Sequence, residues 1–198
     1  MFQRRADFSN LFDYDLIYFS GISLAILPSA VRAKLMTCLE GRPSHVKVGF
    51  DSNYRPNLWE SPEVAAQNIE RAFRCCDIAL PSLTDQKNLM QSKREETVAN
   101  WFMSIGAVQT VLKRGPKGPR LIGGFEEDCK FDNCRDVVDT TAAGDSFNAG
   151  FLALFCTGYS AHTSAKYGHE VANLVIGQHG AICSKTSLES LIRSKIKE

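Results

Sequence analysis

The chain has 198 residues, and 44% of them are hydrophobic, which suits one domain with a buried core and argues against intrinsic disorder. The 23 Lys and Arg residues nearly balance the 22 Asp and Glu residues, so the chain carries no basic field for general nucleic-acid binding. No run approaches the roughly 18 apolar residues of a membrane span, and no apolar stretch follows the positively charged start as in a secretory signal.

Seven cysteines are an odd number, whereas a disulfide framework normally uses an even set in a small secreted chain. Cys129 and Cys134 have no second pair or nearby histidine to complete a metal site, so we expect no metal site made by protein side chains. Reduced thiols and the absence of a membrane segment predict a cytoplasmic protein.

The first half of the chain alternates short apolar runs with amphipathic segments. Ser61-Pro62-Glu63 combines a cap, a proline and an acid, a typical helix start. In chain order, the patterns predict a strand over 16–19, a helix over 29–39, a strand over 46–50, a helix over 61–73, a strand over 77–80 and a helix from 84 or 85.

The second half continues the alternation. Gly115 to Pro119 is rich in glycine and proline and predicts a turn. The remaining patterns predict a helix over 95–105, strands over 109–113, 120–122 and 137–138, and helices over 143–155 and 160–176.

Strands and helices that alternate at this spacing are typical of an α/β fold, with a mostly parallel sheet covered on both faces. We see no linker and no repeat, and expect residues 1–198 to form a single domain. Ligands of such sheets bind at the carboxyl ends of the strands. Polar and glycine residues follow the predicted strands at Ser20-Gly21, 51–55, Ser82, 113–118 and 139–145.

The stretch from Asp139 to Gly150 is the most informative. Its small residues lead directly into a helix, whose first amides lack intrahelical partners and carry partial positive charge. An anion can approach such amides closely. Asp145 falls in the first turn, where a carboxylate could accept a proton from a hydroxyl. Together these features suit phosphoryl transfer to an alcohol. Asp145 could instead only stabilise the helix start.

This stretch closely resembles the D-T-x-G-A-G-D signature of the ribokinase-like (PfkB) sugar kinases, matching at Asp139, Thr140, Ala143, Gly144 and Asp145. The resemblance implies a Rossmann-type three-layer sandwich. It also implies that Asp145 is the catalytic base and that Ala142, Ala143 and Gly144 form an anion hole. Most members have Gly where this chain has Ala142, and a methyl group can be accommodated there only if the local φ is negative.

Other segments resemble one branch of that family, the kinases of 2-keto-3-deoxygluconate. The segment Asp51 to Trp59 is similar to the branch's D-x-N-x-R-x-x-L-W, which implies that Asn53, Tyr54 and Arg55 bind substrate. The planar guanidinium of Arg55 suits a carboxylate, although alone it would be read as a surface arginine. The S-G-I segment implies that Gly21 and Ile22 border the sugar. We expect Trp59 to serve in packing.

The resemblance also implies a nucleotide site. The segment 113–118 is similar to the family's K-x-G-x-x-G turn, which assigns Lys113, Gly115, Lys117 and Gly118 to ATP, although a plain hairpin turn would have the same composition. Ser82 and Asp85 stand where the family has the Asn and Glu of an element associated with magnesium and phosphate. Of these two, Ser82 is assigned to ATP. Asn173, on a late helix, is assigned to the adenine region.

The family pattern also has an N-terminal strand, a Gly-rich sugar segment and a β lid, and nothing before Asp13 resembles them. Two hypotheses follow. The chain is an ATP- and Mg²⁺-dependent kinase of an acid sugar, or a truncated, non-catalytic remnant that binds nucleotide. A fructokinase or ribokinase of the same fold is a third, disfavoured by the segment Asn53-Tyr54-Arg55. We expect small-molecule ligands and a possible homo-oligomer, with no nucleic-acid or membrane partner.

Overall fold

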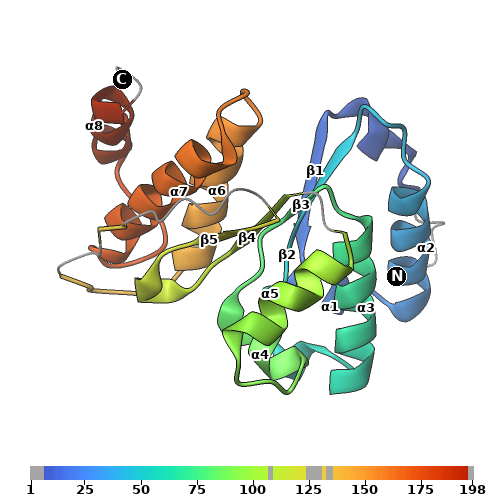
Figure 1. Ribbon diagram of the computed structural model, residues 1–198. Coiled ribbons are helices and arrows are strands. Elements are labelled where there is room, and N and C mark those ends of the chain that lie inside the picture. Colours follow the sequence, from blue (N-terminus) through green and yellow to red (C-terminus); the bar gives the residue numbers. More distant parts are fainter. Residues whose placement is uncertain (1–6, 107–108, 124–130, 133–135, 196–198) are drawn as a thin grey trace. The chain divides into compact units, whose positions relative to one another are not determined.

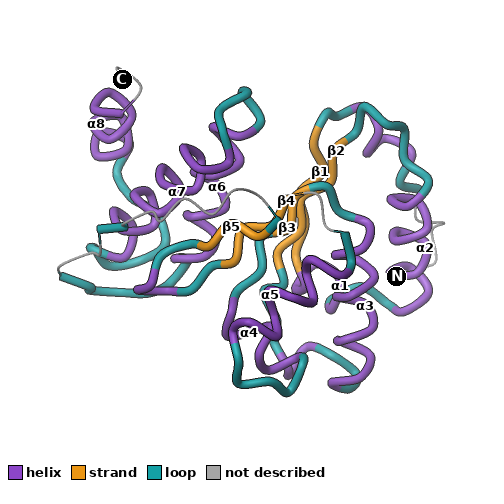
Figure 2. The backbone as a smooth tube through the Cα atoms, viewed as in Figure 1, coloured by secondary structure: helices purple, strands orange, loops and turns teal. Residues whose placement is uncertain are grey.

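The computed structural model describes residues 7–106, 109–123, 131–132 and 136–195 (Figure 1). Figure 2 separates helices, strands and loops by colour. The strands are β1 (Leu16–Ser20), β2 (Lys47–Asp51), β3 (Ile78–Ala79), β4 (Gln109–Leu112) and β5 (Arg120–Ile122). The α-helices are α1 (Gly21–Ala25), α2 (Ser29–Glu40), α3 (Pro62–Cys75), α4 (Leu83–Leu89), α5 (Glu95–Ser104), α6 (Ala143–Phe155), α7 (Ala161–Ile176) and α8 (Lys185–Lys195). Three short 3₁₀ helices are η1 (Ser9–Asp13), η2 (Pro56–Leu58) and η3 (Gly115–Lys117).

The chain divides into two compact units. The first unit comprises Met1–Leu112 and Ile122–Gly124, and the second comprises Lys113–Leu121 and Phe125–Glu198.

The sheet has the strand order β1-β2-β3-β4-β5. Pairing is parallel between β1 and β2, between β2 and β3, and between β3 and β4. Each of these parallel pairs is joined by a helical crossover, as parallel geometry requires. The predicted α/β fold with a mostly parallel sheet is therefore confirmed.

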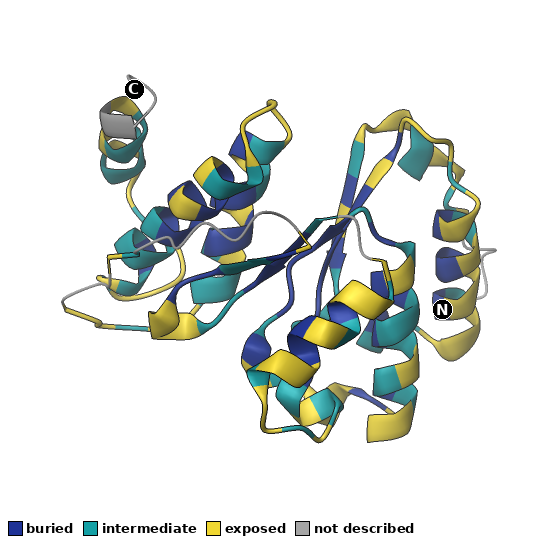
Figure 3. Ribbon diagram, viewed as in Figure 1, coloured by how far each residue is buried: buried dark blue, intermediate teal, exposed yellow. Residues whose placement is uncertain are grey.

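A chain of aromatic rings forms the core of the first unit. Phe19 of β1 lies 4.9 Å from Phe50 of β2 between ring centroids, and Phe50 lies 4.8 Å from Phe73 of α3. Phe73 in turn meets Phe102 of α5 edge to face at 4.9 Å. Figure 3 shows the buried residues concentrated on the strands and on one side of each of these helices. Burying such rings ties helices to the sheet and fixes where the loops after each strand emerge.

The second unit is organised by the close packing of α6 against α7. A Cβ atom added to Gly150 would lie 2.9 Å from the Cα atom of Gly168, and one added to Gly168 would lie 2.7 Å from the carbonyl oxygen of Phe147. Only glycine fits at this crossing. Helix α8 adds Leu188, Leu191 and Ile192 to a small apolar cluster that includes Leu154 and Tyr167.

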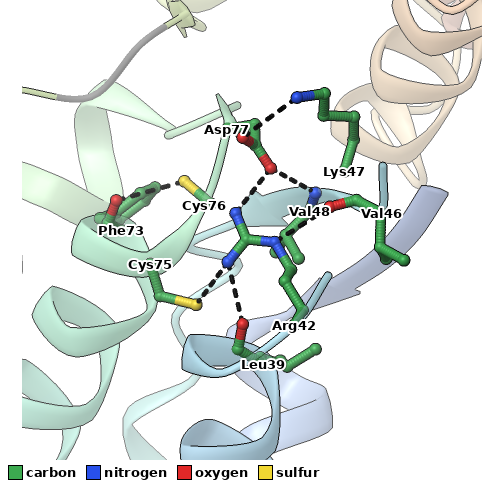
Figure 4. A network of polar contacts seen from close by, with 9 residues as sticks. All are labelled: Leu39, Arg42, Val46, Lys47, Val48, Phe73, Cys75, Cys76 and Asp77. Atoms are coloured by element: carbon green, nitrogen blue, oxygen red, sulfur yellow. Dashed lines mark hydrogen bonds and ion pairs between the residues drawn. The ribbon is translucent and has the colours of Figure 1, made fainter. Parts of the chain in front are cut away.

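A polar network joins the amino ends of β2 and β3 (Figure 4). The guanidinium of Arg42 donates to the Asp77 carboxylate at 2.7 Å and to the Leu39 carbonyl at 2.9 Å. Asp77 also accepts the backbone N–H of Val48 at 2.8 Å. These charges lie at the end of the strands opposite to the one where ligands of parallel sheets bind, so we assign them to stability.

Most predicted elements are confirmed, but the strand predicted over 137–138 is wrong. Val137 is 55% exposed, and the N–H of Val138 donates to the carbonyl of Ile176 near the end of α7 at 2.8 Å, not to a strand. Two apolar residues are too few to identify a strand. The sequence prediction also missed α1 and α8.

Candidate functional site

In the first unit, the loops after β1 and β2 touch closely. A Cβ atom on Gly21 would lie 2.0 Å from the carbonyl oxygen of Ser52, so only glycine allows the start of α1 to approach the loop after β2. Gly21 is buried and Ile22 is half-buried. The predicted substrate residues of these two loops are therefore brought together.

The loop after β2 has a defined backbone conformation. The carboxylate of Asp51 accepts the N–H of Asn53 at 3.2 Å, and Asn53 has a positive φ of 29°. The ring of Tyr54 is buried in the core at 8% exposure, whereas Arg55 is exposed and donates from Nη1 to the Tyr54 carbonyl at 3.0 Å. Of the predicted substrate residues in this loop, Arg55 presents its side chain to solvent.

The start of α4 holds the same loop. The hydroxyl of Ser82 accepts the N–H of Asp85, as an N-cap does. The N–H of Ser82 donates to Ser52 Oγ at 3.1 Å, and the Asp85 carboxylate accepts the N–H of Tyr54 at 3.0 Å. The residues that replace the family's Asn and Glu thus contact the loop of Arg55.

Packing fixes the far end of this loop. Trp59 is buried at 8% exposure, which confirms its expected packing role. The guanidinium carbon of Arg32 lies 4.9 Å from the Trp59 ring centroid, and Arg32 also donates to the Glu60 carboxylate at 2.6 Å. The pKa of Glu60 is lowered by this hydrogen bond. The loop between Ser52 and Glu60 is therefore anchored at both ends.

In the second unit, the turn before α6 departs from one expectation. Ala142 has φ 60° and ψ 16°, a left-handed conformation, so the prediction that alanine requires a negative φ at this position is wrong. The turn needs this conformation because the Thr140 carbonyl accepts the N–H of Ala143 at 3.2 Å and the Ala142 carbonyl accepts the N–H of Ser146 at 2.9 Å. Alanine bears a steric cost of about 1–2 kcal/mol that glycine would not.

Asp145 is exposed in the first turn of α6. By helix geometry, the N–H groups of Gly144 and Asp145 have no carbonyl partner within the helix. At the other end of the turn, the carboxylate of Asp139 accepts the N–H of Thr141 at 2.8 Å and that of Gly180 at 3.1 Å. Hydrogen bonds from the Thr141 side chain and from these two amides lower the pKa of Asp139.

Lys113 reaches the start of α6. Its Nζ atom donates to Asn148 Oδ1 at 3.0 Å, and a Cβ atom on Gly144 would lie 3.5 Å from the same Nζ. Asn148 is only 1% exposed. Asn148 was not among the predicted site residues, although one asparagine between the apolar residues Phe147 and Phe151 is a recognisable signal.

The predicted nucleotide turn is η3. Gly115 and Gly118 have positive φ angles of 59° and 72°, as the turn requires. Arg114 stabilises this turn, because its guanidinium donates to the carbonyls of Gly118 at 3.0 Å and Lys117 at 3.2 Å. Lys117 is exposed.

Asn173 lies on α7 and is engaged with the main chain. Its side-chain amide donates to the carbonyl of Asp132 at 2.6 Å, and Nε2 of His169 lies 2.9 Å from the same oxygen. The His169 ring also meets Phe131 at 5.2 Å. The structure thus shows Asn173 holding the segment 131–132.

Among the described residues, no group of three His, Cys, Asp or Glu side chains could hold a metal ion. Cys129 and Cys134 lie outside the described residues. No helix in the described part of the chain is long and apolar enough to cross a bilayer.

The sequence over residues 2–187 matches the model of the pfkB family of carbohydrate kinases. It is 39% identical over 191 residues to a 2-dehydro-3-deoxygluconokinase of Escherichia coli K12, a match that covers 94% of this chain and 62% of that protein. The chain therefore spans about three fifths of this relative.

Solved structures of kinases match the fold of this chain. The crystal structure of a Salmonella enterica aminoimidazole riboside kinase, complexed with aminoimidazole riboside and an ATP analogue, matches at a TM-score of 0.75 with 26% identity, over 90% of this chain and 63% of that one. A putative ribokinase II of Escherichia coli matches at a TM-score of 0.76 with 22% identity, over 96% of this chain and 62% of that one. The fold is ribokinase-like.

Proposed function

Because the chain belongs to the pfkB family of carbohydrate kinases, we propose that it transfers the γ-phosphoryl group of ATP to 2-keto-3-deoxygluconate, giving 2-keto-3-deoxy-6-phosphogluconate. The observation that carries this proposal is the start of α6. There an exposed carboxylate, Asp145, lies beside Gly144, and the ammonium group of Lys113 is close to the same glycine.

In this proposal, the backbone N–H groups from Ala142 to Gly144 bind the transferring phosphoryl group. The amino end of a helix carries partial positive charge and offers free N–H groups, so it stabilises the charge on a transferring phosphoryl group. Lys113 adds a full positive charge beside Gly144. The turn at Gly115 to Gly118, with Lys117, would lie along the nucleotide, together with Ser82 and Asn173 as further nucleotide contacts.

Asp145 acts as the base in this proposal. It accepts the proton of the terminal sugar hydroxyl while that oxygen forms its bond to the γ-phosphorus, and the bond from that phosphorus to the leaving ADP oxygen breaks. Exposure of the carboxylate in the first turn of α6 supports this role, because the substrate hydroxyl must reach it.

Magnesium fits this site without a protein cage. Mg²⁺ in kinases binds mainly to substrate phosphates and water, with one or two carboxylates, so the absence of a three-ligand cluster among the described residues is compatible with it. When bound, it would neutralise charge on the phosphates.

Specificity for an acid sugar rests on the loop after β2. Arg55 is exposed and its guanidinium can receive a carboxylate in a bidentate manner. Asn53 and Tyr54, with Gly21 and Ile22 in the neighbouring loop, would complete the sugar site. The 39% identity to a 2-dehydro-3-deoxygluconokinase supports this choice over a neutral sugar such as fructose or ribose.

Replacement of Asp145 by asparagine tests the proposal. We expect Asp145→Asn to lower turnover by at least about 100-fold, since proton acceptance is lost, while the dissociation constant of ATP measured by calorimetry changes little. Glu189→Gln, at an acid on α8 of the same unit, serves as the control and should turn over normally. Unchanged turnover in Asp145→Asn would remove this residue from the base role.

A further inference from the structure

The amino end of α4 is bonded to the loop of Arg55 instead of being capped by its own side chains alone. In a reciprocal capping box, the acid three residues after the cap accepts the N–H of the cap residue. Here the cap is Ser82 and the acid is Asp85, but the N–H of Ser82 donates to Ser52 Oγ at 3.1 Å. In a capping box Asp85 would accept the N–H of Ser82, but that N–H is bonded to Ser52 in the loop instead.

The Asp85 carboxylate is directed at that loop. Its Oδ2 atom accepts the N–H of Tyr54 at 3.0 Å and lies 3.4 Å from the hydroxyl of Ser52, which can donate to it. Hydrogen bonds to an ionised acceptor are about twice as strong as neutral ones. This one carboxylate therefore contacts the residues on both sides of Asn53.

The peptide units on both sides of Tyr54 are fixed as a result. The N–H of Tyr54 is bonded to Asp85, and its carbonyl accepts Nη1 of Arg55 at 3.0 Å. Asn53, immediately before, has a positive φ of 29°, a conformation that persists only when its surroundings impose it. The contacts form a continuous path from the Asp85 carboxylate through one residue to the guanidinium of Arg55.

We infer that Asp85 is a positioning residue, which holds Arg55 in place for the carboxylate of an acid sugar. This inference rests on the proposed function for the identity of the ligand. It departs from the resemblance, in which the corresponding acid is associated with magnesium and phosphate. Asp85 acts through Tyr54 and Arg55, and does not itself touch the substrate.

The first test does not need activity. Amide hydrogen exchange is measured by NMR on the wild-type chain, Asp85→Ala and Asp85→Asn. In Asp85→Ala the Tyr54 amide should exchange about tenfold faster or more, because its charged acceptor is gone. The amide of Leu80, which donates to the Phe50 carbonyl, is the internal reference for an intact sheet.

Two further variants sharpen this test. Asp85→Asn keeps an oxygen acceptor, so the exchange rate of Tyr54 should fall between those of the wild type and Asp85→Ala, and this variant decides the matter if the alanine variant does not fold. Thr84→Ala, an exposed neighbour on α4, should leave the rate unchanged. An unchanged Tyr54 rate in Asp85→Ala, or in Asp85→Asn when only that variant folds, would overturn the inference.

The second test separates positioning from metal binding. If Asp85 positions Arg55, Asp85→Asn should raise KM for 2-keto-3-deoxygluconate several-fold and leave the Mg²⁺ concentration for half-maximal turnover unchanged. A tenfold rise in that Mg²⁺ concentration with an unaltered KM for sugar would assign Asp85 to the metal and overturn the inference. Absence of turnover in the wild type would instead refute the proposed function, and hydrogen exchange alone would then decide whether Asp85 holds the loop.

Discussion

Lys113 Nζ donates to Asn148 Oδ1 at 3.0 Å, which holds the lysine side chain against the second turn of α6. A flexible lysine pays an entropic cost when it is ordered beside a phosphate. A buried asparagine that already holds the ammonium near Gly144 reduces that cost.

This contact predicts a graded loss of phosphate binding. Lys113→Met should lower kcat by about 100-fold, the order found when one donor to a developing charge is removed. Asn148→Ala should have a smaller effect, since the charge remains but is less well placed. Steady-state kinetics and ATP calorimetry measure both. Ala149→Ser, exposed on the same helix, is the control. Equal kinetics in Asn148→Ala and the wild type would show that this contact does not position Lys113.

Ala142 predicts a stabilising substitution. Ala142→Gly removes the left-handed strain of about 1–2 kcal/mol and loses about 0.4–1 kcal/mol through the more flexible unfolded chain, so a net gain of between zero and about 1.6 kcal/mol is expected. Ala143→Gly, one residue into α6, should instead destabilise by up to about 1 kcal/mol. Urea unfolding measures both. If Ala142→Gly and Ala143→Gly destabilise the chain equally, the proposed backbone strain at Ala142 is wrong.

Arg55 predicts a loss that depends on substrate charge. Arg55→Ala should lower kcat/KM for 2-keto-3-deoxygluconate by roughly 10- to 100-fold, as expected for a lost charge-assisted contact. The kcat/KM for a neutral analogue should change much less. Arg55→Lys keeps the positive charge but lacks the planar guanidinium, so its loss of kcat/KM should lie between those of the wild type and Arg55→Ala. Equal losses on the acid and the neutral sugar would reject carboxylate recognition.

The hydrogen bonds of Asp139 should contribute to the loss of stability at acid pH. Its pKa is lowered in the folded chain from the usual 3.8, so its hydrogen bonds stabilise the fold above that pH. The contribution is lost as the pH falls below about 3.8 toward the lowered pKa. Asp139→Asn should therefore flatten the decline in stability as the pH falls below 3.8, and Thr141→Ala should flatten it partly. Thermal unfolding across this range measures the effect. An unaltered acid profile in Asp139→Asn would show that these bonds do not contribute.

The order of the elements could be predicted from sequence because the patterns of strand and helix residues are strong between 16 and 122. Apolar periodicity located α3 and α5, and the signature stretch located the start of α6 at Ala143. Short elements gave no such signal. Helix α1 has five residues and begins at a glycine, and Val137-Val138 resembled a strand although the Val138 amide bonds to α7.

The site was predictable where it depends on residue type and less so where it depends on long-range contacts. Arg55 and Asp145 became candidates because a planar guanidinium and a carboxylate in the first turn of a helix have characteristic chemistry, and their roles stay predictions. The contact of Asn148 with Lys113 spans 35 positions, and that of Asp85 with Tyr54 spans 31, so neither follows from local spacing. The φ of Ala142 follows from the two hydrogen bonds that close its turn, which residue type alone did not indicate.

The most direct test of the account is ADP release by this chain in a coupled assay with ATP and Mg²⁺, with and without 2-keto-3-deoxygluconate. The account predicts ADP release that depends on the acid sugar and that yields the 6-phosphate as product. Release of ADP at the same rate without sugar, or no release with any sugar while the chain remains folded, would contradict it.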